Sequence, residues 1–198
     1  MQNQTPSAPR SNSSQHIRAL VECALMVALA VVLDLIPMPK WPNGGSLSIA
    51  AVPIIYISYR RGLGWGLASG LVYSVIKLIT DWYAPPAGTL LATGLCVLLD
   101  YILAFTAFGL AVLFAKTRTN KLVGYGVGAA AVNLIRFLCS FLSGWILWGS
   151  YAPEGQPAWI YSLVYNAGYM LPNAVLCAVI IVLLCALVDP KTLRPMKK

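Results

Sequence analysis

Four ionisable side chains lie within long apolar stretches of this chain and are the residues best placed to do chemistry: Asp34, Lys77, Asp100 and Arg136. A charge in an apolar environment is costly, so it normally faces a partner or a ligand inside the protein. Asp100 and Arg136 lie near the middle of their stretches and cannot easily reach water. They predict a binding site, and a purely structural pair between them is the alternative.

Asp34 and Lys77 have simpler explanations as well. Asp34 is suited to a structural cap or pair near the end of its stretch, and the long side chain of Lys77 is suited to extend toward water. Helical spacing also gathers aromatic, amide and hydroxyl groups around the charges. We expect a ligand site built from Asp100 and the following residues: Tyr73, Lys77, Arg136, Ser140, Trp148, Tyr161 and Asn166.

Other kinds of chemistry lack the residues they need. The only histidine, His16, lies in a polar N-terminal segment, which excludes most histidine-based triads and histidine-rich metal sites. No P-loop motif occurs, so an energy source for transport would have to come from a partner. The five cysteines form no C-x-x-C pair and are interpreted as free packing residues. We expect no enzyme, no metal and no cofactor.

The elements that position these residues are predicted to be transmembrane helices. Hydrophobic residues make up 59% of the chain, charged residues only 10%, and the mean hydropathy is +0.73, which is typical of an integral membrane protein. The apolar stretches are too long and continuous for barrel strands. We predict an all-α membrane protein, a six-transmembrane-helix bundle with helices over residues 17–36, 47–59, 63–80, 90–115, 122–148 and 159–188.

Basic residues favour one side of this arrangement. Eleven of the fourteen lysines and arginines, Arg60 and Arg61 among them, flank the helices on one side, and only Lys40 falls on the other. The positive-inside rule therefore predicts that both termini are cytoplasmic. The net charge of +8 is a topology signal, and nucleic-acid binding is a poor interpretation of it. The predicted organisation is a disordered tail, the membrane domain and a basic tail, at residues 1–16, 17–188 and 189–198.

Small residues recur every fourth position on two of the predicted helices. Ala24 and Ala28 form an A-x-x-x-A motif, and Gly62, Gly66 and Gly70 repeat on the third helix. Such stripes let helices approach closely. They suit either packing within the bundle or docking on another membrane subunit, and an A-x-x-x-A motif alone favours packing.

Several segments carry a resemblance to one known family: ALMVA (24–28), GGSLS (44–48), YRRGL (59–63), LDY (99–101), SGWILWGSYAPEGQ (143–156) and WIYSLVYN (159–166). The chain resembles the substrate-binding S-components of energy-coupling factor (ECF) vitamin transporters, above all the thiamine-binding group. The likeness covers about residues 17–188. Its most specific part is the Trp-x-x-Tyr-Ala segment with Tyr-Ser-Leu-x-x-Asn downstream.

The resemblance implies a six-helix bundle in the bacterial cell membrane that binds thiamine near the extracellular side, under the loop after the first helix. It implies that Ala24 and Ala28 dock on a transmembrane coupling subunit driven by two ATPase subunits. The positions that match the family's pocket are Asp100, Arg136, Trp148, Tyr161, Asn166 and Tyr73. Trp41 lies near, but offset from, a tryptophan of the family's first loop.

A thiamine-like ligand suits these side chains. Thiamine is a cation with two aromatic rings, so a carboxylate can supply countercharge, and each Trp or Tyr face adds about 0.5–2 kcal/mol. Ser140 stands where some thiamine binders carry a histidine, which removes one aromatic contact. The alternatives are a thiamine precursor or another small aromatic ligand, and a self-sufficient small transporter.

Overall fold

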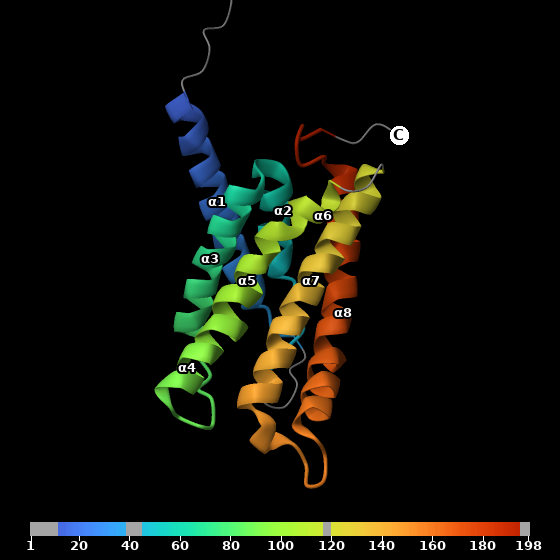
Figure 1. Ribbon diagram of the computed structural model, residues 1–198. Helices are drawn as coiled ribbons and strands as arrows, with labels where there is room; N and C mark the ends of the chain where they lie inside the picture. Colours follow the sequence, from blue (N-terminus) through green and yellow to red (C-terminus); the bar gives the residue numbers. More distant parts are fainter. Residues whose placement is uncertain (1–11, 39–44, 117–119, 195–198) are drawn as a thin grey trace, which may run out of the picture.

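The computed structural model describes residues 12–38, 45–116 and 120–194, and no strand element lies in these ranges. Figure 1 shows the helices in order: α1 (Asn12–Asp34), α2 (Ala51–Arg61), α3 (Leu63–Thr80), α4 (Leu90–Cys96), η2 (Val97–Leu103), α5 (Ala104–Thr106), η3 (Ala107–Leu110), α6 (Ala111–Ala115), α7 (Lys121–Leu147), η4 (Gly149–Tyr151) and α8 (Ala158–Leu187). Segments α4 to α6 form one continuous rod. All five cysteines are free, as predicted, and four of them are buried.

Five helical runs in the described ranges are long and apolar enough to cross a membrane: 13–34, 63–80, 90–115, 121–147 and 158–187. The prediction of an all-α membrane protein is thereby confirmed. The second predicted helix is shorter than expected, because α2 begins at Ala51 and its 11 residues extend only about 16 Å. The first helix is longer than expected and begins at Asn12.

The chain reverses sharply between α2 and α3. Gly62 has a φ of 91°, in the left-handed region that favours glycine, and its N–H donates to the carbonyl of Ser58 at 2.8 Å. Arg60 and Arg61 occupy the last turn of α2, where the negative end of the helix dipole stabilises positive charges. Both guanidinium groups contact the carboxylate of Glu22 at 2.6 Å, which ties α1 to this turn.

The glycine repeat of α3 is used for packing inside the bundle. A Cβ on Gly66 would lie 3.1 Å from the Cα of Gly109, and one on Gly70 would lie 2.8 Å from the carbonyl oxygen of Phe105. The absence of side chains therefore lets α3 contact the rod formed by α5 and η3 at backbone distance. For these two glycines, the packing interpretation is confirmed.

The two ends of the bundle differ in charge. The start of α1, the α2–α3 turn, the α6–α7 connection and the end of α8 gather at one end, which we call the cation end (Figure 1). The described cations in these segments are Arg18, Arg60, Arg61, Lys116, Lys121, Lys191 and Arg194. The α3–α4 and α7–α8 connections lie at the opposite end, and Lys40 lies outside the described residues.

Candidate functional site

A cavity of about 230 Å³ lies between α3, η2, α7 and α8. Residues of the α3–α4 and α7–α8 connections also line it, and both connections lie at the end of the bundle opposite the cation end (Figure 1). Pockets for drug-sized ligands run to about 300–1,000 Å³, so this space suits a smaller molecule. Eight predicted site residues line it: Tyr73, Lys77, Asp100, Arg136, Ser140, Trp148, Tyr161 and Asn166. Trp41, the ninth, lies outside the described residues.

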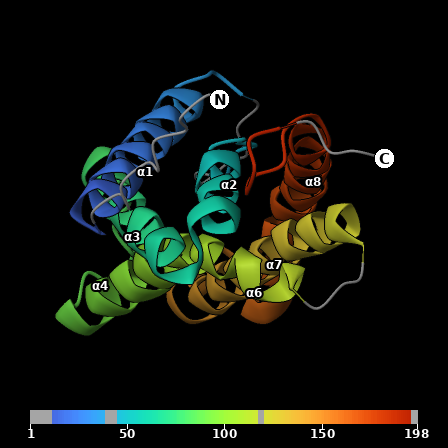
Figure 2. The ribbon, with the colours of Figure 1, turned by 90° about the horizontal axis from the view of Figure 1, so that it is seen from above.

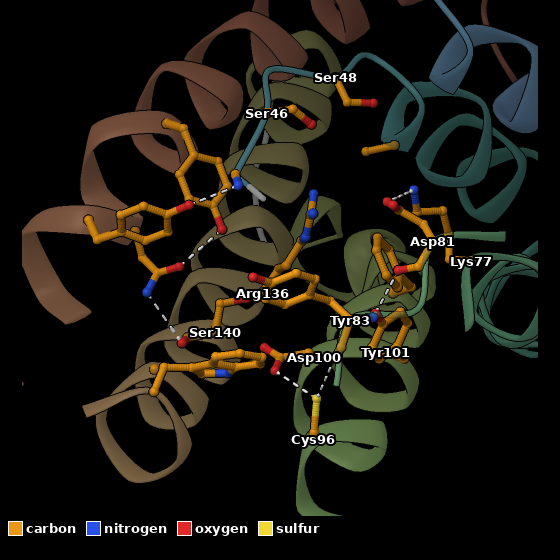
Figure 3. Close-up of a pocket in the computed structure, with 18 of the residues that line it drawn as sticks. Ser46, Ser48, Lys77, Asp81, Tyr83, Cys96, Asp100, Tyr101, Arg136 and Ser140 are labelled. Atoms are coloured by element: carbon orange, nitrogen blue, oxygen red, sulfur yellow. Dashed lines mark hydrogen bonds and ion pairs between the residues drawn. The ribbon is translucent and has the colours of Figure 1, made fainter. Parts of the chain in front are cut away.

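Asp100 reaches the cavity from the π-helical segment η2 (Figure 3). π-Helical turns are rare and occur frequently at functional sites. The carboxylate accepts hydrogen bonds from Ser143 Oγ of α7 and, at 3.6 Å, from Cys96 Sγ one turn earlier. Both donors are uncharged. In the described part of the chain, no cation stands within ion-pair distance of Asp100, so it does not form the direct pair with Arg136 that the sequence left open.

Arg136 lies against aromatic rings on the other side of the cavity. Its guanidinium carbon is 4.8 Å from the ring centroid of Phe105 and 5.8 Å from that of Phe108. Cation–π contacts of this kind hold a guanidinium beside apolar rings and leave its N–H groups available. Asp100 and Arg136 thus present opposite charges to one space without neutralising each other by direct contact. A ligand can meet a negative and a positive region in the same cavity.

An aromatic stack closes the cavity at the end of α7. The ring of Trp148 lies 5.2 Å from Tyr83 at an interplanar angle of 24°, and 5.9 Å from Tyr151 at 17°. Tyr83 comes from the α3–α4 connection, where its N–H donates to Tyr101 Oη at 3.1 Å. The hydroxyl of Tyr101 in turn donates to the carbonyl of Asp81 at 2.7 Å, which fixes the connection against η2. Flat faces held in this way suit a planar ligand.

Helix α8 contributes a row of tyrosines and a buried amide. Tyr161 and Tyr165 stack at 5.9 Å, and Tyr169 meets Tyr165 edge-on at 5.7 Å. Asn166 Nδ2 donates to the carbonyls of Ser162 at 2.9 Å and Ser140 at 3.3 Å, and its Oδ1 accepts from Tyr169 at 3.0 Å. The amide that we predicted as a ligand contact therefore also holds α7 against α8. The backbone of Ser140, as well as its side chain, takes part in the site.

Comparisons with known proteins identify the family. A family model described as "Thiamine transporter protein (Thia_YuaJ)" matches residues 20–193. This chain belongs to that thiamine transporter family. Two relatives are both named "Thiamine transporter ThiT". The one from Bacillus subtilis is 37% identical over 185 residues, which cover 87% of this chain and 93% of the relative. The one from Lacticaseibacillus paracasei is 30% identical over 171 residues, which cover 82% of this chain and 84% of the relative. A solved structure of ThiT from Listeria monocytogenes has a TM-score of 0.74 at 25% identity, covering 91% of this chain and all of that one.

Three charged side chains of this family member meet at the rim of the cavity. Lys77 Nζ lies 2.6 Å from Asp34 Oδ2. It also lies 2.7 Å from Asp81 Oδ2 (Figure 3). Asp34 also accepts from Ser48 Oγ at 2.8 Å. The structural pairing considered for Asp34 is therefore present. Lys77 does line the cavity, but two carboxylates already compensate its charge, which distinguishes it from Arg136.

The described end of the connection between α1 and α2, residues 45–50, contributes to the lining of the same cavity. Gly45 N–H donates to Tyr165 Oη at 2.9 Å. Asn173 of α8 binds the backbone of this segment at two further residues. Its Oδ1 accepts from Ser48 N–H at 2.9 Å, and its Nδ2 donates to the carbonyl of Ser46 at 3.0 Å. Sequence reasoning missed Asn173, because its contacts are with the backbone of a segment more than 120 residues away.

The predicted docking residues lie outside this site. The side chains of α1 that face the bundle are Ala19, Cys23, Val27 and Ala30. Ala24 and Ala28 are exposed on the opposite side of the helix. Packing inside this chain therefore does not account for the A-x-x-x-A motif, in contrast to the glycines of α3.

Proposed function

We propose that this protein is the substrate-binding S-component of an ECF importer and captures thiamine at the outer face of the bacterial cell membrane. The observation that supports this most strongly is the cavity, where the carboxylate of Asp100 and an aromatic stack face the same space. A flat cationic ligand needs both groups. The relatives are named as transporters, which supports a transport role in place of catalysis.

In the proposed complex, Asp100 supplies countercharge and a hydrogen bond to the aminopyrimidine, while Trp148 and its tyrosine neighbours stack on a ring. Arg136 and Tyr161 would orient the polar ends of the ligand, and Tyr73 would support Arg136 from α3. Ser140 would leave space where a histidine of some relatives stands. These roles follow from the lining of the cavity and from family resemblance.

The proposed topology has six membrane-embedded helices and both termini in the cytoplasm. Its support is the gathering of cations at one end of the bundle, since positive segments are retained on the cytoplasmic side. The cavity then opens to the outside. Helix α2 is too short to span alone, so we propose that the loop before it completes the crossing within the shelter of α1 and α8.

The proposed partners are a transmembrane coupling subunit and two ATPase subunits. The described chain carries no P-loop motif, so energy for uptake would come from those subunits. We propose that the exposed Ala24 and Ala28 allow a helix of the coupling subunit to approach α1 closely. The bilayer itself is the remaining partner, and no nucleic acid is involved.

Calorimetry on the purified full chain tests the ligand. We expect thiamine to bind one to one, and the isolated aminopyrimidine half to bind about tenfold more weakly or worse, because it lacks the cationic ring. Tighter binding of the pyrimidine half would favour the precursor alternative, which the serine at position 140 supports. Binding of neither compound would overturn the proposal.

Uptake assays separate an S-component from a self-sufficient transporter. Cells that express this chain with the coupling and ATPase subunits should accumulate labelled thiamine. Cells that express the chain alone should not. Equal uptake without the other subunits would contradict the assignment as an S-component and leave thiamine binding intact.

A further inference from the structure

A second cavity, of about 410 Å³, lies on the outer surface of the bundle between α1, α2 and α8. Figure 2 shows α2 set between these two longer helices. Its walls are almost wholly apolar and include Leu29 and Leu33 of α1, Val52 and Tyr56 of α2, and Leu184 and Leu187 of α8. We call this cavity the α1–α8 groove. It is separate from the cavity that contains Asp100, because the two share no lining residue.

The groove is open toward the surroundings of the bundle. Leu29, Leu184 and Leu187 are 45%, 39% and 68% exposed, respectively. In a membrane-spanning bundle, such side chains face lipid, and a groove of this depth is filled by acyl chains or by a protein helix. A group the size of a water molecule occupies about 30 Å³. The groove therefore has room for roughly a dozen groups of this size, which is the scale of one acyl chain.

Charge distinguishes between these two occupants. One turn beyond Tyr56, Arg60 joins the two walls of the groove at the cation end, since its guanidinium contacts Glu22 of α1 and donates to the carbonyl of Pro190 after α8 at 3.1 Å. Lys191 Nζ donates to the carbonyl of Arg60 at 3.4 Å. The apolar groove thus ends directly beneath a group of basic side chains.

The basic group carries a net positive charge. Arg60, Arg61, Lys191 and Arg194 are its cations, and Glu22 and Asp189 are its acids. Burial lowers the pKa of Lys191, and the neighbouring cations Lys116 and Arg60 act in the same direction while Asp189 opposes them. An anion placed at this end would therefore relieve repulsion among cations that already face one another.

We propose that the α1–α8 groove is a binding site for an anionic glycerophospholipid of the inner leaflet. One acyl chain lies along Leu29, Val52 and Leu184, and the phosphate lies beside Lys191 and Arg60. Each basic residue near a membrane surface contributes about 1 kcal/mol toward an anionic headgroup, roughly fivefold in occupancy. The apolar groove and the basic group thus match the two halves of one molecule.

The position of the groove on α1 separates this site from the proposed protein contact. At 3.6 residues per turn, the groove side chains of α1 are centred roughly half a turn away from Ala24 and Ala28. A lipid in the groove therefore leaves the A-x-x-x-A face free. The proposal stands independently of which small molecule the other cavity binds.

Native mass spectrometry of the delipidated full chain, with added phosphatidylglycerol or phosphatidylcholine of identical acyl chains, tests the site. We expect the parent to retain phosphatidylglycerol in preference. Leu184→Trp fills the groove and should lower lipid retention about tenfold, as the loss of about two buried methylene contacts would do. Leu183→Trp is the matched control, because Leu183 is 59% exposed and lies outside the groove.

A charge variant tests the headgroup contact separately. Lys191→Ser should reduce the preference for phosphatidylglycerol about fivefold, whereas Lys121→Ser, which removes a cation at the same end on α7, should not. Melting curves establish that all variants are folded. Equal retention of both lipids by the parent, or equal behaviour of the two Trp variants, would show only ordinary boundary lipid. Loss of partner assembly in Leu184→Trp with unchanged lipid retention would assign the groove to a protein helix.

Discussion

At the cation end, Arg60 and Arg61 share the carboxylate of Glu22, whereas in the cavity Asp100 and Arg136 face a common space without an ion pair between them. The first group fixes α1, α2 and the segment after α8 to one another. The second leaves charge available, because the groups that contact Asp100 and Arg136 are hydroxyl, thiol and aromatic groups. The shared carboxylate of Glu22 thus holds the bundle together, whereas the charges of Asp100 and Arg136 stay available to a ligand in the cavity between them.

Ala28→Trp is expected to have the largest effect and to separate the two regions most cleanly. A large side chain on the exposed face of α1 would hold a partner helix away, so uptake in cells with the coupling subunits should fall to background. Ligand binding by the purified variant should be unchanged. Ala28→Gly, which stays small, should retain uptake. Loss of binding together with uptake would mean that this face supports the bundle itself.

Asp100→Asn should weaken thiamine binding about 10- to 100-fold, since hydrogen bonds to charged groups are worth about 1.5–3 kcal/mol. Glu154→Gln is the matched control, because it removes an acid on the exposed α7–α8 connection outside the cavity. Titration calorimetry measures both. Equal affinity of Asp100→Asn and the parent would reduce Asp100 to a structural acceptor for Ser143.

The sequence predicted the helices that form long apolar stretches. It did not predict features that depend on tertiary contacts. The bounds 63–80 agree with α3, and 90–115 agree with the α4–α6 rod. The π-helical segment that carries Asp100 was not predicted, because side-chain pattern does not specify a backbone bulge. Helical spacing grouped residues of α3, α7 and α8 that line the cavity. Tyr83 and Tyr151 were missed because connections have no periodicity to read.

Trp148→Phe should have a smaller effect on the ligand cavity. Loss of part of a stacked indole costs about 0.5–1.5 kcal/mol, so affinity should fall roughly two- to tenfold. Quenching of tryptophan fluorescence by ligand should diminish as well. Trp145→Phe is the matched control, since Trp145 is 48% exposed on the outward side of the same helix. Full quenching in Trp148→Phe would assign the signal to another tryptophan.

Asn173→Ala probes the described end of the α1–α2 connection and should have the smallest effect on binding. It removes two part-buried hydrogen bonds, each worth about 0.5 kcal/mol, so ligand dissociation should accelerate about fivefold in stopped-flow measurements. Asn120→Ala removes two comparable side-chain-to-backbone bonds at the cation end. Its dissociation rate should match that of the parent. Equal acceleration in both variants would indicate general loosening of the bundle in place of a loop contact.

An experimental structure with thiamine tests the central claim most directly. The account predicts ligand density in the cavity at the end opposite the cations, with Asp100 in hydrogen-bond contact with the aminopyrimidine and Trp148 stacked on a ring. Arg136 should remain beside Phe105. Density at another position, or thiamine in the cavity with Asp100 still bound to its protein neighbours and not to the ligand, would contradict the account.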